Sequence, residues 1–252
     1  MASLTEKIIS SKDVRSKTVR AFVIFIFLTI AAIFSWRWLI HQPEDNGVQA
    51  PLRAVLTGNE NLFSNYIYSP DNLSRAYSPD EAVPRVRVNG DVGLEGNLDT
   101  AAWKLQVVRS PGDTLFLSLN EIKALPKTQI IFDFKCIEGW SQIAHWGGVK
   151  FSDFVKKYNL TSQSNMKYVG LNTPDKKYYV GIDTRSIMHP QTILCYEMNG
   201  RPLPMNQGYP LRLIIPVKYG IKHLKRIGTI FFSNDKPKDY WYEQGYDYYS
   251  GL

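Results

Sequence analysis

The sequence predicts a β-rich α+β domain that follows a single N-terminal transmembrane helix. One observation is an apolar stretch at residues 21–40, which is long enough for a helix to cross the hydrocarbon core of a bilayer. A second is a series of short strand patterns from residue 85 onward, bounded by turn residues. The third is that long helices do not alternate with these strands, which argues against a doubly wound parallel sheet.

The charges around the apolar stretch predict its orientation. Trp36, Arg37 and Trp38 near its end suit the headgroup region. The basic residues that precede it are Lys7, Lys12, Arg15, Lys17 and Arg20. By the positive-inside rule we expect residues 1–20 in the cytoplasm, a transmembrane helix at 21–40 and the large domain outside. A cleaved signal peptide is the alternative, but bulky residues 35–38 do not form the small-residue cleavage site that it needs.

Residues 41–84 are expected to form a polar linker with a short helical segment. The stretch from Pro51 to Phe63 is amphipathic and predicts a short helix. Two Ser-Pro-Asp triplets, at 69–71 and 78–80, are turn or helix-start patterns. The domain proper is then expected at residues 85–252.

The first half of the domain contains strand patterns and one capped helix. Residues 85–89 alternate and end at the Asn89-Gly90 turn, which predicts a strand, and 103–108 predicts another. Ser118 and Glu121 form a capping-box pattern, so a helix is expected at 118–125, before Pro126. The apolar run 129–134 predicts a buried strand that delivers Cys136.

The second half begins with a helix and continues with strands. Phe151, Phe154 and Val155 recur at helical spacing and predict a helix at 149–158. Further strand patterns lie at 167–171, 178–182, 191–198, 211–216 and 228–232.

Composition excludes several function classes. The net charge is +7, but five of the basic residues precede the apolar stretch and no nucleic-acid motif is present, so no nucleic-acid partner is expected. The four histidines lack metalloprotease spacing, and two cysteines allow at most one disulfide. The chain also carries no haem-attachment or iron–sulfur spacing.

Cys136 is the strongest candidate for chemistry. It directly follows the apolar run and precedes a loop rich in Trp and Gly. A cysteine thiolate is a soft ligand and can hold a metal whose other ligands come from a cofactor. The alternative is a buried free cysteine, the common state of this residue, and Cys195 within its apolar strand is expected to be such a core residue.

Short motifs around and beyond Cys136 occur in a specific order. They include Phe134-Lys135-Cys136-Ile137-Glu138-Gly139-Trp140-Ser141, Trp146-Gly147-Gly148-Val149, Met188-His189-Pro190, Glu197-Met198-Asn199-Gly200, Gly208-Tyr209-Pro210-Leu211-Arg212, residues 218–225 and Tyr240-Trp241-Tyr242-Glu243. Over about residues 85–252 the chain thereby resembles the molybdopterin-dependent oxidoreductases of the sulfite oxidase fold. Each motif alone is weak, but their order and spacing together are specific.

This resemblance implies a Mo-molybdopterin cofactor. Cys136 is expected to be the thiolate ligand of molybdenum, and Arg212 to bind the pterin phosphate with its planar fork. The other residues implied to lie at the cofactor are His223, Leu224 and Lys225 at the phosphate and pterin edge, Thr173, Gln207 in place of a His or Asn, and Asn59 from the N-terminal segment. Residues 218–225 also carry Lys218 and Lys222, which a solvated helix face would explain as well as an anion site.

The family transfers an oxygen atom in two-electron steps. Loop 137–149 has no arginine, unlike the cationic pocket expected for a sulfur oxyanion such as sulfite, and resembles that of the bacterial protein-methionine-sulfoxide reductases. A small sulfoxide, or methionine sulfoxide in proteins, is therefore the expected substrate. Sulfite oxidation and a cofactor-free, membrane-anchored binding module are the alternatives.

The expected location is the bacterial inner membrane, with a single span and the catalytic domain in the periplasm. Electrons must come from a separate partner, such as a haem membrane protein or a cytochrome. Exported relatives usually carry a twin-arginine signal, and Arg15 and Arg20 do not form that pair. How a cofactor-loaded domain is exported therefore stays open.

Overall fold

Two five-stranded sheets form the domain. The computed structural model describes residues 10–251. The first sheet has the order β10-β9-β6-β5, and β11 also pairs with β9. Its strands are β5 Lys127–Lys135, β6 Ser141–Lys150, β9 Ile193–Met198, β10 Arg201–Pro202 and β11 Arg212–Ile214, and all of their pairings are antiparallel.

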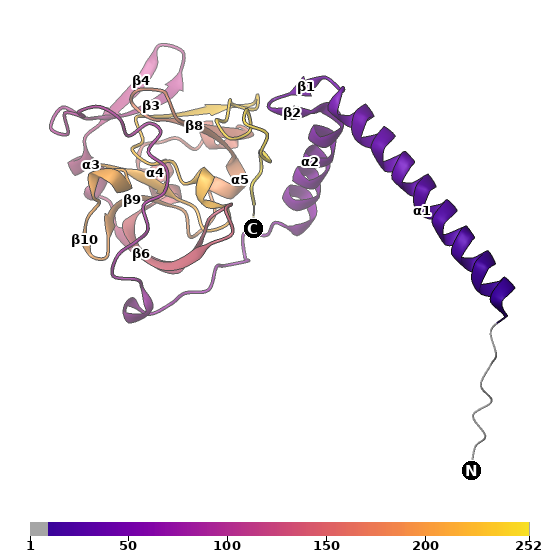
Figure 1. Cartoon of the computed structure of the whole chain (residues 1–252). Helices are drawn as coiled ribbons and strands as arrows, with labels where there is room; N and C mark the ends of the chain where they lie inside the picture. The colour runs from indigo at the N-terminus through magenta and orange to yellow at the C-terminus, as the bar shows by residue number, and fades with distance from the viewer. Residues whose placement is uncertain (1–9, 252) are drawn as a thin grey trace.

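The second sheet has the order β4-β3-β12-β7-β8. Its strands are β3 Leu105–Ser110, β4 Asp113–Leu117, β7 Tyr168–Asn172, β8 Tyr179–Asp183 and β12 Thr229–Ser233. The strand β12 pairs in parallel with β3 and antiparallel with β7. Figure 1 shows β3, β4 and β8 at the top of the domain and β6, β9 and β10 below them.

Short helices and turns connect the strands. They are α3 Leu119–Lys123, α4 Phe151–Lys157, α5 Thr184–Ile187 and the single turns η3 Gln163–Asn165, η4 Met205–Gln207 and η5 Gly220–Lys222. The predicted capping box of α3 is confirmed, because Ser118 accepts from the Glu121 amide and Glu121 accepts from the Ser118 amide. Phe151, Phe154 and Val155 of α4 are buried in the main core, as their spacing predicted.

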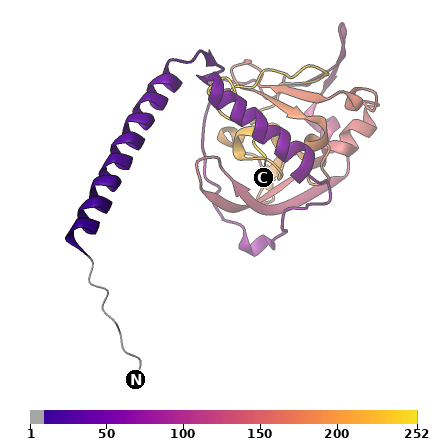
Figure 2. The same ribbon diagram turned by 90° about the vertical axis from the view of Figure 1, so that its right-hand side faces the viewer.

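The N-terminal part consists of two helices and a small hairpin. Helix α1 Ser11–Ile40 is followed by β1 Glu44–Asp45, β2 Val48–Gln49, α2 Ala50–Leu62 and a π-helical turn, η1 Phe63–Ile67. Ser10 caps α1, so this helix begins ten residues before the apolar stretch. Of the described helices, α1 alone is long and apolar enough to cross a membrane, and none of its residues is buried. It extends away from the domain (Figures 1 and 2).

Two expectations about local structure are wrong. Residues 85–89 form no strand, because side chains from elsewhere satisfy their backbone, as described below. The Trp- and Gly-rich stretch after Cys136 is not one long loop: four residues turn the chain, and Ser141–Lys150 then forms β6. The glycines there permit close packing, since a Cβ on Gly148 would lie 2.2 Å from the Leu194 carbonyl oxygen of β9.

Candidate active site

A cleft opens beside the end of β5. Its empty volume, with the open mouth included, is about 890 Å³. Four chain segments and the single residue Tyr178 line it. The segments are residues 86–92, the β5–β6 turn with parts of both strands, the stretch from η4 to Lys225, and the C-terminal region. The lining residues are Val86, Arg87, Asn89, Gly90, Val92, Phe134, Cys136, Ile137, Glu138, Trp140, Gln142, Trp146, Tyr178, Gln207, Arg212, Gly220, Ile221, His223, Lys225, Trp241 and Tyr246.

Cys136 lies at the start of the tight turn between β5 and β6. Its amide donates to the Trp140 carbonyl (2.9 Å), and its own carbonyl accepts from the Gly139 amide (3.1 Å). Gly139 has a φ of +88°, a conformation that glycine adopts without steric penalty. The thiol is 6 % exposed and faces Asn89, whose Nδ2 lies 3.7 Å from Sγ. The turn therefore presents a nearly buried thiol to the cleft.

Arg212 is a buried cation without an acidic partner. It is 2 % exposed, and among the described residues no carboxylate oxygen lies within 4 Å of its guanidinium. Its Nη1 donates to the backbone and side-chain oxygens of Gln207, at 3.1 and 2.9 Å. Burial lowers the pKa of Arg212 to about 10. Since an unpaired buried charge is unfavourable, this group suits an anionic ligand.

Gln207 and Lys225 hold the irregular segment 86–90 against the site. The Gln207 amide donates to the carbonyls of Val86 and Arg87. The Lys225 ammonium donates to the carbonyls of Asn89 (2.7 Å) and Gly90 (2.8 Å). These side-chain hydrogen bonds take the place of the backbone hydrogen bonds that a strand at 85–89 would make to a neighbouring strand. Burial, and secondarily the Arg212 charge, lowers the pKa of Lys225 to about 7.

His223 lines the cleft, but both of its ring nitrogens are engaged. Its Nε2 donates to the Lys218 carbonyl (3.1 Å), and Nδ1 accepts from the Ile215 amide (3.4 Å). Burial, and then the charge of Arg212, lowers the pKa of His223 to about 3, so the ring is neutral. The backbone amides of His223 and Leu224 donate to carbonyls within the same turn. Leu224 itself is a core residue and does not line the cleft.

Thr173 and Asn59 do not line the cleft. Thr173 is fully buried beside it: its hydroxyl bonds Asp175 (2.6 Å) and both backbone groups of the cleft residue Tyr178. A Cβ on Gly93 would lie 2.5 Å from Thr173, so these residues are in close contact. Asn59 is exposed on α2 and is not among the residues that line the cleft. The expectation that Asn59 lies at the cofactor has no support in this arrangement.

Lys218 and Lys222 form neither a solvated face nor part of the cleft. Both are 1 % exposed. Lys218 bonds Asp183 (2.9 Å), and Lys222 bonds Asp239 (2.5 Å) together with the Gly181 carbonyl. Of the three lysines in residues 218–225, only Lys225 reaches the cleft.

Several cleft residues were not singled out from the sequence. Arg87 is exposed at the cleft, with its guanidinium 4.6 Å from the Trp140 ring centroid. Loop 137–149 lacks arginine as noted, but Arg87 and Arg212 reach the same cleft from other segments. Asn89, beside the thiol, lies in the stretch that resembled a strand. Its place before Gly90 was interpreted only as a turn signal.

Three buried N–H donors of cleft residues have no partner among the described residues. They are Nε of Arg212, Nε1 of Trp146 and Nε2 of Gln142. The Arg212 guanidinium lies over the Trp146 ring, 4.7 Å from the ring centroid. Buried donors are normally hydrogen-bonded. A thiol, three basic side chains and unsatisfied donors around one aromatic-walled cleft together fit a metal-bearing, anionic cofactor.

A family model described as "Oxidoreductase molybdopterin binding domain" matches residues 92–241. Among curated proteins, "Putative protein-methionine-sulfoxide reductase subunit YedZ1" from Azospira oryzae is 32% identical over 212 residues, which cover 82% of this chain and 79% of that protein.

Two further relatives have the name "Protein-methionine-sulfoxide reductase catalytic subunit MsrP". The one from Xanthomonas campestris is 34% identical over 58% of this chain and 49% of its own length. The one from Campylobacter jejuni is 30% identical over 60% and 55%. The matches thus span about half of these two relatives. The sulfane dehydrogenase SoxCD from Paracoccus pantotrophus aligns with a TM-score of 0.49 and 15% identity, over 56% of this chain and 40% of that one.

Proposed function

Because the chain belongs to the oxidoreductase molybdopterin binding domain family, we propose that it reduces a sulfoxide substrate and that Cys136 is the protein ligand of molybdenum. The observation that carries this proposal is the placement of the Cys136 thiol in one cleft with the unpaired cation of Arg212. The thiolate is a soft donor that suits this metal, and the guanidinium fork suits a phosphate.

The remaining cleft residues have defined tasks in this proposal. Arg212 and Lys225 would bind the phosphate of the pterin, and Gln207 would orient Arg212 through its side-chain oxygen. When bound, the cofactor supplies two-electron oxygen-atom transfer, and the protein supplies orientation and electrostatics. The Asn89 side-chain amide donates toward the sulfur of Cys136 and would help to orient it.

Aromatic side chains exclude water from the thiol. Phe134 lies 6.1 Å, centroid to centroid, from both Trp140 and Trp146, and all three line the cleft. A neutral sulfoxide fits such walls, because it needs no cationic cage. The names of the relatives, which include protein-methionine-sulfoxide reductases, support methionine sulfoxide as the substrate class.

Sulfite oxidation is the second candidate. The observation that favours it is Arg87, an exposed cation at the cleft that can attract a small dianion. The two reactions run in opposite redox directions, so a single preparation can separate them.

We further propose that α1 anchors the enzyme in the bacterial inner membrane with the domain in the periplasm. The support is the length and apolarity of α1 and the basic residues before it. A retained anchor would keep the domain near a membrane haem protein or cytochrome that supplies electrons.

The test is turnover by full-length protein from a molybdate-fed host with its own cofactor maturation. We expect oxidation of a reduced dye with methionine sulfoxide as the acceptor, and loss of this activity in Cys136→Ser. Cys195→Ser is the matched control. Cys195 is buried in the core, where burial raises its thiol pKa to about 12, and a serine hydroxyl can still donate to the Glu197 carbonyl.

Oxidation of sulfite without reduction of methionine sulfoxide would contradict the proposed reductase activity and favour the oxidase. Full activity of Cys136→Ser would contradict the role of the thiol.

A further inference from the structure

The outer face of α2 and η1 presents large apolar side chains to solvent. Leu52, Val55, Leu62 and Tyr66 recur at helical spacing, and their exposed fractions are 40, 61, 49 and 83%. This spacing puts them on one stripe along the helix. Ile67, the last residue of η1, is also exposed. An apolar stripe of this size on a short exposed helix calls for an apolar surface that covers it.

The inner face of the same helix is fixed to the domain. Arg53 is 4 % exposed and donates to four backbone carbonyls, those of Asp45, Asn46, Tyr242 and Tyr246. Its guanidinium also lies 4.1 Å from the ring centroid of Tyr242. One turn from the end of α2, Glu60 pairs with Lys236 (2.8 Å). The outer stripe therefore keeps a defined direction relative to the domain.

The short connection between α1 and α2 places α2 where the chain would leave a membrane. The β1–β2 hairpin, within residues 41–49, separates the two helices. In Figures 1 and 2, α2 runs across the direction of α1, near its C-terminal end, on the side of the domain from which α1 departs. Trp36 and Trp38 at this end of α1 are exposed, and tryptophan suits the interface between lipid and water.

We infer that α2 and η1 lie on the lipid bilayer surface as an interfacial helix, with Leu52, Val55, Leu62 and Tyr66 in the headgroup region. This inference rests on the proposed α1 anchor. An apolar stripe opposite a polar, docked face is the pattern of helices that lie in the membrane plane. We assign the bilayer as the surface that covers this stripe, because a membrane-spanning α1 would place α2 beside a bilayer in every molecule.

The interfacial helix would also orient the active site. Arg53 of α2 donates to the Tyr246 carbonyl at 2.9 Å, and Tyr246 lines the cleft. One side chain thus joins the helix on the membrane to the rim of the cleft. The domain would then be held in one orientation, with this part of the cleft rim near the lipid surface.

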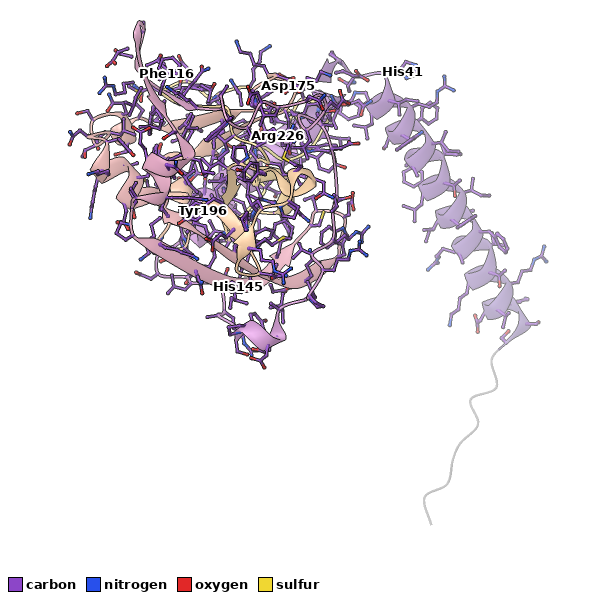
Figure 3. All side chains as sticks on the ribbon, turned by 90° about the vertical axis from the view of Figure 1, so that its left-hand side faces the viewer. His41, Phe116, His145, Asp175, Tyr196 and Arg226 are labelled. Atoms are coloured by element: carbon purple, nitrogen blue, oxygen red, sulfur yellow. The ribbon has the colours of Figure 1, made fainter. Side chains whose placement is uncertain are left out.

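The test uses the full chain in nanodiscs of phosphatidylethanolamine and phosphatidylglycerol. An environment-sensitive fluorophore is attached to single introduced cysteines in a Cys195→Ser background. Val55→Cys probes the stripe. Phe116→Cys is the matched control, because Phe116 is also apolar and exposed (53%) but lies on the other side of the domain from His41, where α1 ends (Figure 3). Phe27→Cys probes the middle of α1, and protein without an added cysteine gives the background.

We expect the label at Val55 to be quenched by lipids with a headgroup-level spin label. We also expect it to be protected from aqueous iodide by about fivefold or more relative to Phe116. For Phe27 the lipid quencher is a spin label on the acyl chain, because the middle of a spanning helix lies at the bilayer centre. Iodide access at Val55 equal to that at Phe116, with acyl-chain quenching at Phe27, would overturn the inference and leave the anchor intact. No acyl-chain quenching at Phe27 would overturn the anchor itself. Protection from both quenchers at Val55 would mean burial against protein, which also contradicts the inference.

Discussion

Arg212 and Trp146 stack in the wall of the cleft, with the guanidinium carbon 4.7 Å from the indole centroid. Each keeps one buried N–H that no described residue accepts, Nε of Arg212 and Nε1 of Trp146. The Trp146 ring covers one face of the guanidinium, and the Gln207 oxygens hold one of its ends. Arg212 is therefore held in place for an anionic partner such as a phosphate.

Replacing Arg212 by Lys should weaken cofactor retention while the charge is kept. The ammonium cannot reproduce the fork or the stacking, and a hydrogen bond between charged groups contributes about 1.5–3 kcal/mol. A loss of that size corresponds to roughly 10- to 100-fold weaker binding. Pterin and phosphate released from purified protein measure it. Arg109→Lys is the control, because Arg109 forms an exposed pair with Asp113 on the β3–β4 hairpin.

The stability of the cofactor-free protein should rise with pH above 7. The pKa of Lys225 is lowered to about 7, mainly by burial, whereas a lysine in the unfolded chain titrates near 10.4. Between these values the unfolded state binds more protons, so unfolding becomes less favourable as pH rises. Lys218, with a pKa lowered to about 8, acts in the same direction.

Lys225→Met should therefore reduce, but not abolish, the rise in Tm between pH 7 and about 9.5. Thermal melts of protein from a host without pterin synthesis measure this, with Lys135→Met on the exposed end of β5 as the control. Equal pH slopes in the wild type and Lys225→Met would contradict the assignment.

Asp239→Asn should destabilise the domain strongly. Asp239 and Lys222 are both 1 % exposed, and the substitution leaves the lysine charge buried and unpaired. Breaking a buried pair in this way costs about 3–5 kcal/mol. Denaturant unfolding measures it. The exposed pair between Lys177 and Glu95 is the comparison, and Glu95→Gln should cause no detectable change.

Arg87→Gln should distinguish the two candidate substrates. A neutral sulfoxide gains little from the Arg87 charge, so the KM for methionine sulfoxide should stay within about threefold of the wild-type value. If the enzyme oxidises sulfite, the variant should have a higher KM for sulfite, and this KM should depend less on salt. The reason is that Arg87 is an exposed cation at the cleft. Steady-state kinetics at two ionic strengths measure both. A large rise in the KM for the sulfoxide alone would contradict the proposed substrate class.

Local sequence signals predicted the elements whose stability is local. The Ser118–Glu121 capping box and the apolar face of α4 are both present as expected, because caps and helical periodicity act within a few residues. The strand predicted at 85–89 is absent for the opposite reason. Its backbone partners are Gln207 and Lys225, more than a hundred residues away, and no local pattern encodes them.

The site was predicted in part. The resemblance brought together Cys136, Gln207, Arg212, His223 and Lys225, which all line one cleft. It did not identify Asn89 or Arg87, because their segment has the residue pattern of a strand. The buried ion pairs of Lys218 and Lys222 were missed as well, since their partners Asp183 and Asp239 come from distant parts of the chain.

The central claim is that the Cys136 thiolate is a ligand of molybdenum. X-ray absorption at the molybdenum edge, on full-length wild type and Cys136→Ser with matched metal and pterin contents, tests it most directly. We predict that the variant loses one sulfur from the metal coordination shell, while Cys195→Ser keeps the wild-type spectrum. An unchanged sulfur count in Cys136→Ser would contradict the claim.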